Sequence, residues 1–283
     1  MTGNDDEKMA SSGKHEVDPL RMYWWDQKVN FGDLIGPWLV REITGRDVVN
    51  TMWEEVGEAP GLLTVGSLLH SLRRSGLDVW GAGSMRSLDE AFVKKLSVRQ
   101  PRKIHAVRGW RTYQELTSKL GWQVPKVYGD PALLAPRFHS AIQSDVTKGR
   151  ISIVPHYFHK KYFDPLEGDR FHIVNVARDP TIVIDEIASS DVCMSTSLHG
   201  VIVAHAYQVP WVWVRVADHP LRGDRFKFED FFTVLDRSNV GEVSLNVEDI
   251  TAGFMTAHAK KAAVPANKFT FDDLLDAFPS ELS

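Results

Sequence analysis

The hydrophobic residues of this chain fall in short apolar runs that alternate with segments of helical period. Runs of this kind are typical of strands buried on both faces of a parallel sheet, and the segments between them of covering helices. In the first half the pattern predicts strands at residues 21–25, 61–65, 77–80, 104–107 and 126–128. In the second half it predicts strands at residues 151–154, 171–176, 192–194 and 211–216. The chain is therefore expected to be an α/β protein.

Helices are expected between these strands and after the last of them. Their predicted positions are residues 34–44, 66–72, 90–96, 111–120, 181–188, 201–207, 228–235, 247–263 and 270–278. A polar, unpatterned stretch at residues 137–150 separates the two sets of strands. Because 283 residues exceed the usual size of one domain, we expect two. The predicted limits are a disordered tail over 1–19, an N-terminal domain over 20–140 and a C-terminal domain over 150–283.

The most informative stretch runs from Ser189 to Pro210. Three hydroxyl residues, Ser195, Thr196 and Ser197, lie where a predicted strand gives way to a buried helix, and His199 and Gly200 follow them. The first N–H groups of a helix lack internal partners and attract anions such as phosphate or carboxylate. A histidine there can also donate or accept a proton. From this stretch alone, an equally good interpretation is that Ser197 only caps the helix and His199 packs against the sheet.

Other polar or flexible residues follow predicted strands in the first half. Asn30 and Asp33 precede a helix, Gly83 lies in a glycine loop, and Arg108 directly follows a strand. Ligands of open parallel sheets bind at the carboxyl ends of strands, where a glycine allows close approach and an arginine can bind an anion through two hydrogen bonds. Helix capping alone would also account for Asn30 and Asp33.

Composition narrows the function classes. The net charge is −4 without a basic stripe, which argues against nucleic-acid binding. The single cysteine, Cys193, lies in an apolar run, so we expect an inert buried thiol and no disulfide within the chain. No apolar segment is long enough to span a bilayer and residues 1–19 lack a signal sequence, so a cytoplasmic location is expected. Nine tryptophans offer flat faces for sugar binding.

Five motifs occur in an order that resembles the polysaccharide pyruvyl transferase family. They are Asn30–Asp33 (NFGD), Val79–Ser84 (VWGAGS), Ala106–Gly121, Val127–Pro136 (VYGDPALLAP) and Ser195–Pro210 (STSLHGVIVAHAYQVP). The last is the most specific, because it is similar to the family's Ser-x-x-His-Gly followed by a buried helix and a proline. The resemblance extends from Asn30 to about Leu235.

The resemblance implies a GT-B-like fold, with two Rossmann-like domains whose parallel sheets face a cleft. It also implies transfer of the pyruvyl group of phosphoenolpyruvate onto a sugar of an exopolysaccharide precursor, with a pyruvate ketal as product and phosphate released. Phosphoenolpyruvate would be the donor substrate, and no cofactor is expected. The acceptor would be a lipid-linked oligosaccharide at the inner face of the cell membrane, with peripheral membrane association. Oligomeric state stays open, and scattered histidines predict no metal site.

The resemblance also implies roles for single residues. His199 would be the acid that protonates the donor, and Asp33 or Asp130 the base that activates the acceptor hydroxyl. Arg108 would bind one anionic group of the donor, and the residues Ser195–Ser197 with Gly200 the other.

The remaining binding candidates follow from one departure from the family. Some relatives would carry an arginine where this chain has Ser197, so another cation must supply the charge. The candidates are Arg178, His156, Lys160 and Lys161. Asn30 and Gly83 complete the predicted binding residues, with the acceptor on the N-terminal domain and phosphoenolpyruvate on the C-terminal one.

Two other functions fit the same architecture. A GT-B glycosyltransferase would use the helix N-terminus for the diphosphate of a nucleotide sugar. A non-catalytic carbohydrate-binding protein would account for Ser197 as the trace of a lost active site.

Overall fold

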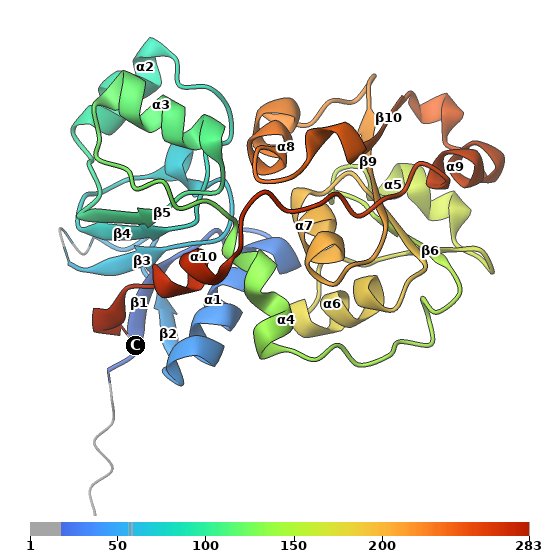
Figure 1. Ribbon diagram of the computed structural model, residues 1–283, viewed down its shortest axis with the longest axis horizontal. Coiled ribbons are helices and arrows are strands. Elements are labelled where there is room, and N and C mark those ends of the chain that lie inside the picture. Colours follow the sequence, from blue (N-terminus) through green and yellow to red (C-terminus); the bar gives the residue numbers. More distant parts are fainter. Residues whose placement is uncertain (1–17, 56, 58, 283) are drawn as a thin grey trace, which may run out of the picture.

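The computed structural model describes residues 18–55, 57 and 59–282. It contains two five-stranded sheets in which every strand pair is parallel, and helices lie around both (Figure 1). The α/β class and the two parallel sheets predicted from the apolar runs are thereby confirmed. The predicted tail over residues 1–19 falls almost entirely on residues 1–17, which lie outside the described residues.

The first sheet has the strand order β2-β1-β3-β4-β5. Its strands are β1 (Leu20–Tyr23), β2 (Val48–Asn50), β3 (Gly61–Leu63), β4 (Leu77–Trp80) and β5 (Lys103–Ala106). Alternate residues of these strands bury side chains on opposite faces: Met22 and Trp80 pack in one cluster, Tyr23 and Val79 in another. A sheet covered on both faces explains why its strands lack a polar side.

The second sheet has the order β10-β9-β8-β6-β7. Its strands are β6 (Ile151–Val154), β7 (Phe171–Ile173), β8 (Val192–Ser195), β9 (Trp211–Val216) and β10 (Gly241–Leu245). Cys193 lies buried in β8, and burial raises the pKa of its thiol to about 12, so the inert thiol expected from the sequence is what the structure contains.

The helices connect the strands and cover the sheets. They are α1 (Phe31–Thr44), α2 (Glu90–Ser97), α3 (Trp110–Leu120), α4 (Ala135–Phe138), α5 (Lys160–Phe163), α6 (Pro180–Ala188), α7 (Leu198–Ala206), α8 (Asp224–Phe232), α9 (Ala252–Ala259) and α10 (Asp272–Asp276). Short 3-10 turns include η1 (Leu68–Ser71), η2 (Pro131–Leu134) and η5 (Val247–Asp249). None of the described helices has both the length and the apolar character needed to cross a bilayer.

Both sheets share one winding order. Numbered along the chain within each sheet, the strands lie in the order 2-1-3-4-5, so each chain half reverses direction between its first and third strands. Ligands of doubly wound sheets bind at this reversal, outside the carboxyl ends of the strands. The reversal falls between β1 and β3 in the first sheet and between β6 and β8 in the second.

Several predicted elements differ from those in the structure. Residues 126–128 form only an isolated bridge, between Val107 and Tyr128, while the short strands β2 and β10 were not predicted. β2 is three residues long with partly exposed side chains, and β10 alternates polar with apolar residues, so neither shows the continuous apolar run used to find strands. The helix predicted over 247–263 is the turn η5 followed by α9.

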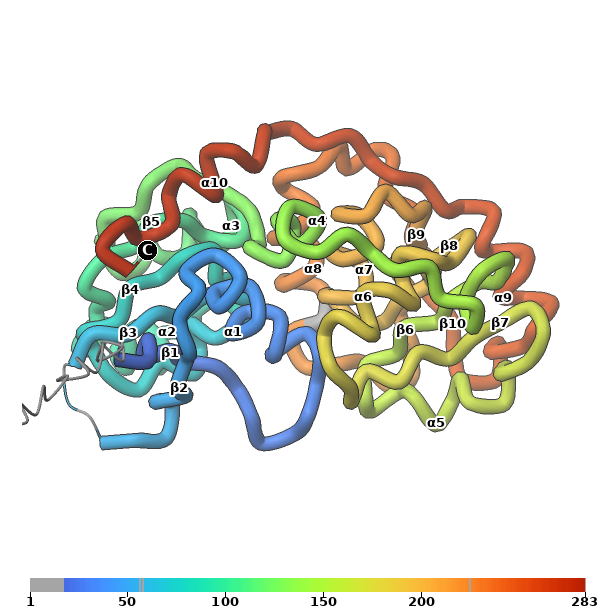
Figure 2. The backbone as a smooth tube through the Cα atoms, turned by 90° about the horizontal axis from the view of Figure 1, so that it is seen from below, coloured from blue at the N-terminus to red at the C-terminus, as the bar shows by residue number. Residues whose placement is uncertain are grey.

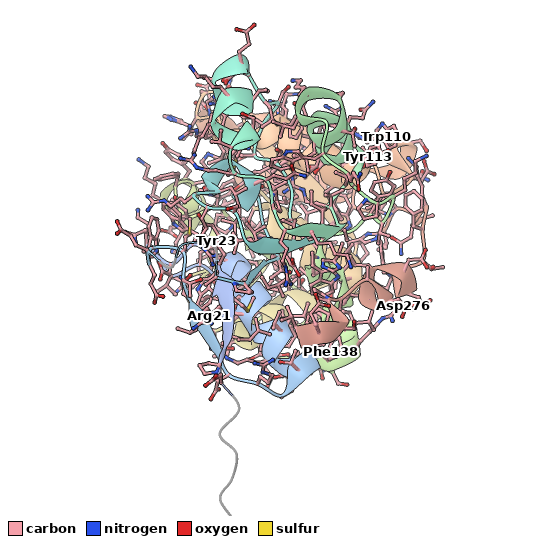
Figure 3. All side chains as sticks on the ribbon, turned by 90° about the vertical axis from the view of Figure 1, so that its left-hand side faces the viewer. Arg21, Tyr23, Trp110, Tyr113, Phe138 and Asp276 are labelled. Atoms are coloured by element: carbon pink, nitrogen blue, oxygen red, sulfur yellow. The ribbon has the colours of Figure 1, made fainter. Side chains whose placement is uncertain are left out.

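The C-terminal segment crosses back to the first sheet. Figure 2 shows it running along both halves before it reaches α10. Leu274 of α10 packs in one cluster with Leu20 and Met22, and its carbonyl accepts a 2.7 Å hydrogen bond from the Trp80 indole. Figure 3 shows α10, marked by Asp276, beside the end of α4, marked by Phe138. The sequence analysis had placed residues 150–283 in one C-terminal domain, whereas α10 belongs structurally to the first half.

One buried ion pair joins the two halves. Arg108, after β5, and Asp230, on α8, are both fully buried, with 2.9 Å between Nη2 and Oδ2. Arg108 Nε also donates to Asp230 Oδ2 at 3.0 Å. The same carboxylate accepts hydrogen bonds from the backbone N–H and the hydroxyl of Thr112, each at 2.7 Å. The Asp230 carboxylate, in the second half, therefore has its charge and hydrogen bonds paired by Arg108 and Thr112 of the first half.

We predict that Asp230→Asn lowers the free energy of unfolding by about 3–5 kcal/mol, because it leaves the Arg108 charge buried without its partner. The matched control is Asp272→Asn, whose carboxylate pairs with Arg137 at 2.5 Å on the exposed surface and should contribute less than about 1 kcal/mol. Denaturant unfolding of both variants measures the difference. Equal unfolding free energies for Asp230→Asn and the parent would contradict this account of the joint.

Candidate active site

His199 lies at the reversal of the second sheet, in the first turn of α7. Its side chain is largely buried, and Nε2 is 3.8 Å from Oδ2 of Asp130, which precedes η2. Both atoms are buried, and neither has a hydrogen-bond partner among the described residues. Because an unpartnered buried polar atom is costly, two of them facing each other indicate a place where a ligand or water group belongs.

Backbone of the first half encloses the His199 ring. A Cβ atom on Gly32, in α1, would lie only 2.2 Å from His199 Nδ1, so only glycine leaves room for the imidazole there. The Phe31 N–H donates a 2.8 Å hydrogen bond to the Val176 carbonyl oxygen, which ties the start of α1 to the second half. The NFGD motif and the histidine signature therefore meet in one site.

Asp33 contributes a carboxylate with a raised pKa to this site. It lies half-buried in the first turn of α1, and Asn30 Nδ2 donates to its Oδ2 at 2.7 Å. Burial raises the pKa of Asp33, and the Asn30 hydrogen bond and the nearby charges of His199 and Lys227 offset this only in part. A carboxylate with a raised pKa is better suited to accept a proton than an ordinary surface aspartate.

Lys227 is the functional candidate that the sequence analysis missed. It lies in α8 with most of its side chain buried. Burial has the largest effect on the pKa values of Asp33 and His156, and the charge of Lys227 lowers both. The predicted helix began at residue 228, one position later, so nothing in the sequence pattern drew attention to this lysine.

The loop after β6 forms one rim of the site. Burial, followed by the charge of Lys227, lowers the pKa of His156 to about 3, which disfavours its imidazolium form as the source of the missing positive charge. Its ring packs on Tyr157 with centroids 4.2 Å apart. From the first half, the Lys28 ammonium lies 4.8 Å from the centroid of the Tyr157 ring and 5.4 Å from that of Phe158. These contacts join Lys28 of the first half to the loop after β6 in the second half.

The hydroxyl cluster mainly shapes the strand end. Ser195 Oγ lies 2.8 Å from the carbonyl oxygens of Val154 and Ser197 and accepts from the Ser197 N–H at 3.0 Å. Thr196 Oγ1 accepts from the His156 N–H at 2.8 Å. Ser197 is the N-cap residue of α7, but its side chain makes no capping hydrogen bond. Ser195 and Thr196 thus have partners in the protein itself.

Two glycines predicted to bind substrate instead make room for neighbouring side chains of the protein. A Cβ on Gly200 would lie 2.3 Å from Ser195 Oγ, so glycine lets α7 approach the strand end. A Cβ on Gly83 would lie 2.3 Å from the Arg108 guanidinium carbon. In this structure the close approach at Gly83 is therefore to Arg108.

Arg108 holds the fold instead of presenting a free guanidinium. Besides its bond to Asp230, Nη1 donates to Ser67 Oγ and Nη2 to the Ser84 carbonyl oxygen, each at 2.7 Å. The sequence analysis placed this arginine correctly after a strand but had no signal for Asp230, which lies far along the chain on α8. Arg108 is better described as a positioning residue that fixes α8.

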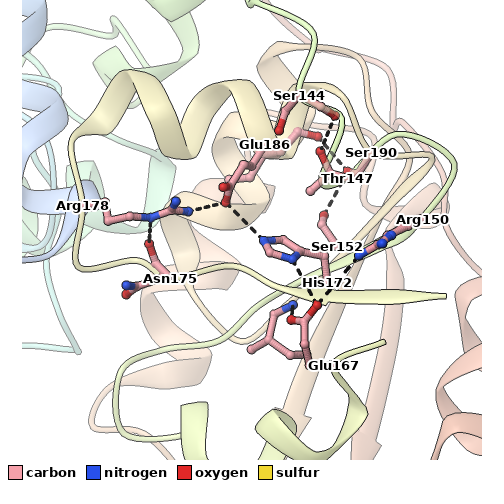
Figure 4. Close-up of polar contacts among 12 residues, drawn as sticks. Ser144, Thr147, Arg150, Ser152, Glu167, His172, Asn175, Arg178, Glu186 and Ser190 are labelled. Carbon is pink, nitrogen blue, oxygen red and sulfur yellow. Dashed lines mark hydrogen bonds and ion pairs between the residues drawn. The ribbon is translucent and has the colours of Figure 1, made fainter. Parts of the chain in front are cut away.

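Arg178 and Lys160 are also engaged. Figure 4 shows the Arg178 guanidinium bonded to Glu186 and to the Asn175 carbonyl oxygen, with Glu186 reaching on to His172. Burial raises the pKa of Glu186, but hydrogen bonds from His172 and Arg178 lower it by more, so both partners favour its carboxylate form. Lys160 pairs with Asp164 at 2.5 Å on the surface.

One group of described side chains has the spacing of metal ligands, namely Asp78, His105 and Glu281. Arg102 Nε and Nη2 already donate to the two oxygens of Asp78, at 2.8 and 2.5 Å. A cation there would have to displace a guanidinium.

Comparison with known proteins agrees with the motif analysis. Residues 79–219, about half of the chain, match the family model for polysaccharide pyruvyl transferases. An uncharacterized protein of Acanthamoeba polyphaga mimivirus is 25% identical over 220 residues, which cover 76% of this chain and 74% of that protein. The family match spans Gly83, Arg108, Asp130 and His199, whereas Asn30, Asp33 and Lys227 lie outside it.

We predict that Asp33→Asn raises the stability of the protein at neutral pH. Because the folded-state pKa of Asp33 lies above its unfolded value, ionisation disfavours the folded state as pH rises through that pKa. The gain should disappear below the ordinary aspartate pKa of about 3.9, where the carboxyl is protonated in both states. Denaturant unfolding across this range is the measurement, with exposed Asp169→Asn as control. A loss of stability at neutral pH would contradict the assignment.

Proposed function

Residues 79–219 of this chain belong to the polysaccharide pyruvyl transferase family, and we propose that the chain transfers the pyruvyl group of phosphoenolpyruvate to two hydroxyls of one sugar. The product is a cyclic pyruvate ketal on a polysaccharide precursor, expected to be a lipid-linked oligosaccharide. The observation that carries the proposal is the unpartnered pair formed by His199 Nε2 and Asp130 Oδ2. A sugar hydroxyl can donate a hydrogen bond to Asp130 Oδ2, which leaves the His199 Nε2 proton for the donor substrate.

The chemistry requires one acid and two proton acceptors. His199 donates a proton to the methylene carbon of phosphoenolpyruvate, and the adjacent carbon gains positive charge. One sugar hydroxyl attacks that carbon and loses its proton, the bond to the phosphate oxygen breaks, and the second hydroxyl attacks in turn. Two carbon–oxygen bonds form and one breaks. One hydroxyl proton replaces that of His199, and the other leaves with phosphate or solvent.

Two carboxylates flank the proposed acid. Asp130 lies 3.8 Å from His199 Nε2, and Asp33 is close enough for the His199 charge to lower its pKa. Asp33 and Asp130 come from different elements, α1 and the turn before η2. We assign Asp33 as the base for the first hydroxyl because its pKa is raised. In this proposal Asp130 accepts the proton of the second hydroxyl, since its Oδ2 has no hydrogen-bond partner among the described residues.

Binding of the donor needs positive charge. Phosphoenolpyruvate carries a phosphate and a carboxylate, and this chain has Ser197 where some relatives would have an arginine. We propose that Lys227, reaching the site from α8, supplies that charge together with the first amides of α7. The site thus gains from α8 the charge that its own signature motif lacks.

We predict that Lys227→Met weakens phosphoenolpyruvate binding about tenfold or more, the loss expected for one charge-assisted hydrogen bond. His199→Gln should retain binding within a few-fold and abolish turnover, since it removes the acid while leaving the cation. Calorimetric titration and phosphate release with acceptor present measure the two effects. Lys260→Met, at an exposed position at the end of α9, is the control.

Two outcomes would overturn the proposal. The first is the absence of phosphoenolpyruvate binding by the folded parent protein, with and without acceptor sugar. The second is an equal loss of affinity in Lys227→Met and Lys260→Met. Tight binding of a nucleotide sugar in place of phosphoenolpyruvate would identify the chain as a glycosyltransferase.

A further inference from the structure

A separate hollow of about 340 Å³ lies at the carboxyl edge of the first sheet. Residues that follow four of its strands line it, together with two residues of α2 and one of the loop before α8. The lining includes Trp25, Trp53, Arg73, Arg86, Lys95 and Arg222. Its volume falls within the range of pockets that hold small ligands, and none of the proposed acid, base and lysine groups lines it.

Two tryptophans present rigid faces to this hollow. Trp25 and Trp53 are each more than a third exposed, and their rings meet edge to face with centroids 5.4 Å apart. The Trp53 indole donates a 2.6 Å hydrogen bond to Asp26 Oδ1, which fixes the ring. Exposed indoles held in place supply flat apolar surface at little entropic cost, and the C–H face of a sugar ring is a natural partner for such surface.

The same hollow is positively charged. Arg73, Arg86, Lys95 and Arg222 line it, and no acidic residue is among its described lining, although Arg86 also pairs with Asp89 at 3.6 Å. The effect is visible on His70, whose pKa is lowered to about 4, first by burial and then by the charges of Arg86, Lys95 and Arg222. The Arg73 guanidinium stacks 4.6 Å from the centroid of the Trp53 ring, so a positive charge and an aromatic side chain lie next to each other in the hollow.

The hollow adjoins the catalytic site through two residues. Ser67 lines it and accepts the 2.7 Å hydrogen bond from Arg108. The preceding residue, Gly66, lies against the imidazole, since a Cβ built on it would be 4.0 Å from His199 Cε1. A ligand seated against Trp25 and Trp53 can therefore extend past this backbone toward His199.

We propose that this hollow is the acceptor subsite and that the acceptor is an anionic saccharide, a sugar chain carrying a phosphate or carboxylate group. The tryptophans bind a sugar ring, and the cations around Arg73 bind the anionic group. This inference rests on the proposed function for the identity of the ligand as acceptor. The binding preference itself follows from the hollow alone.

The test is direct binding of three saccharides to the full chain at low and high salt. The probes are a neutral glucoside, glucose 1-phosphate and glucuronic acid. We predict that at least one anionic sugar binds tenfold or more tightly than the neutral one and that salt removes the difference. Comparison of glucose 1-phosphate with glucuronic acid tells a phosphate source of the charge from a carboxylate source.

Variants locate the binding. Trp53→Ala should weaken the binding of all three saccharides, and Arg73→Gln only that of the anionic ones, whereas Arg41→Gln, exposed in the last turn of α1, should change neither. Phosphoenolpyruvate affinity should be the same in Trp53→Ala as in the parent, so failure of donor binding and failure of this subsite are separate results. Equal affinity for neutral and anionic saccharides, or anionic binding that survives Arg73→Gln unchanged, would overturn the inference.

Discussion

The buried ion pair between Arg108 and Asp230 is the constraint on which the site depends. It joins the end of β5 to α8, and the Asp230 carboxylate also accepts two hydrogen bonds from Thr112 of α3. Lys227 lies on the same helix, one turn before Asp230, so a contact that fixes one residue also fixes the other. The proposed donor-binding charge is therefore positioned by an interaction between the two halves. A chain whose halves separated would lose the site together with the joint.

The two halves make unequal contributions to the proposed chemistry. The second half provides the acid, His199, at the reversal of its strand order, and the cation, Lys227. The first half provides both carboxylates, Asp33 and Asp130, and the glycine backbone that encloses the imidazole. Acid and bases thus meet only when the halves are together, as expected for a reaction between two substrates. The tryptophan-lined hollow extends this division, because it lies at the carboxyl edge of the first sheet.

Much of this arrangement is readable from the sequence. Apolar runs identified β4, β6 and β9 at their observed limits, and the motifs placed Asn30, Asp33 and His199 at strand ends, where the structure brings them together. The missing parts depend on contacts between distant residues. Arg108 was predicted to bind a ligand because Asp230 gave no local signal, and Lys227 lies at the edge of a helix whose start was placed too late. The short strands β2 and β10 lack a continuous apolar run, and the return of α10 depends on packing against Trp80.

The most direct test of the account is a crystal structure of the protein with phosphoenolpyruvate bound. The account predicts density for the donor beside His199, with its methylene carbon toward the imidazole and an anionic group on Lys227 and the first amides of α7. The carboxylates of Asp33 and Asp130 should lie on the side left open for the acceptor. Donor density away from His199, or at His199 with Lys227 directed elsewhere, would contradict it.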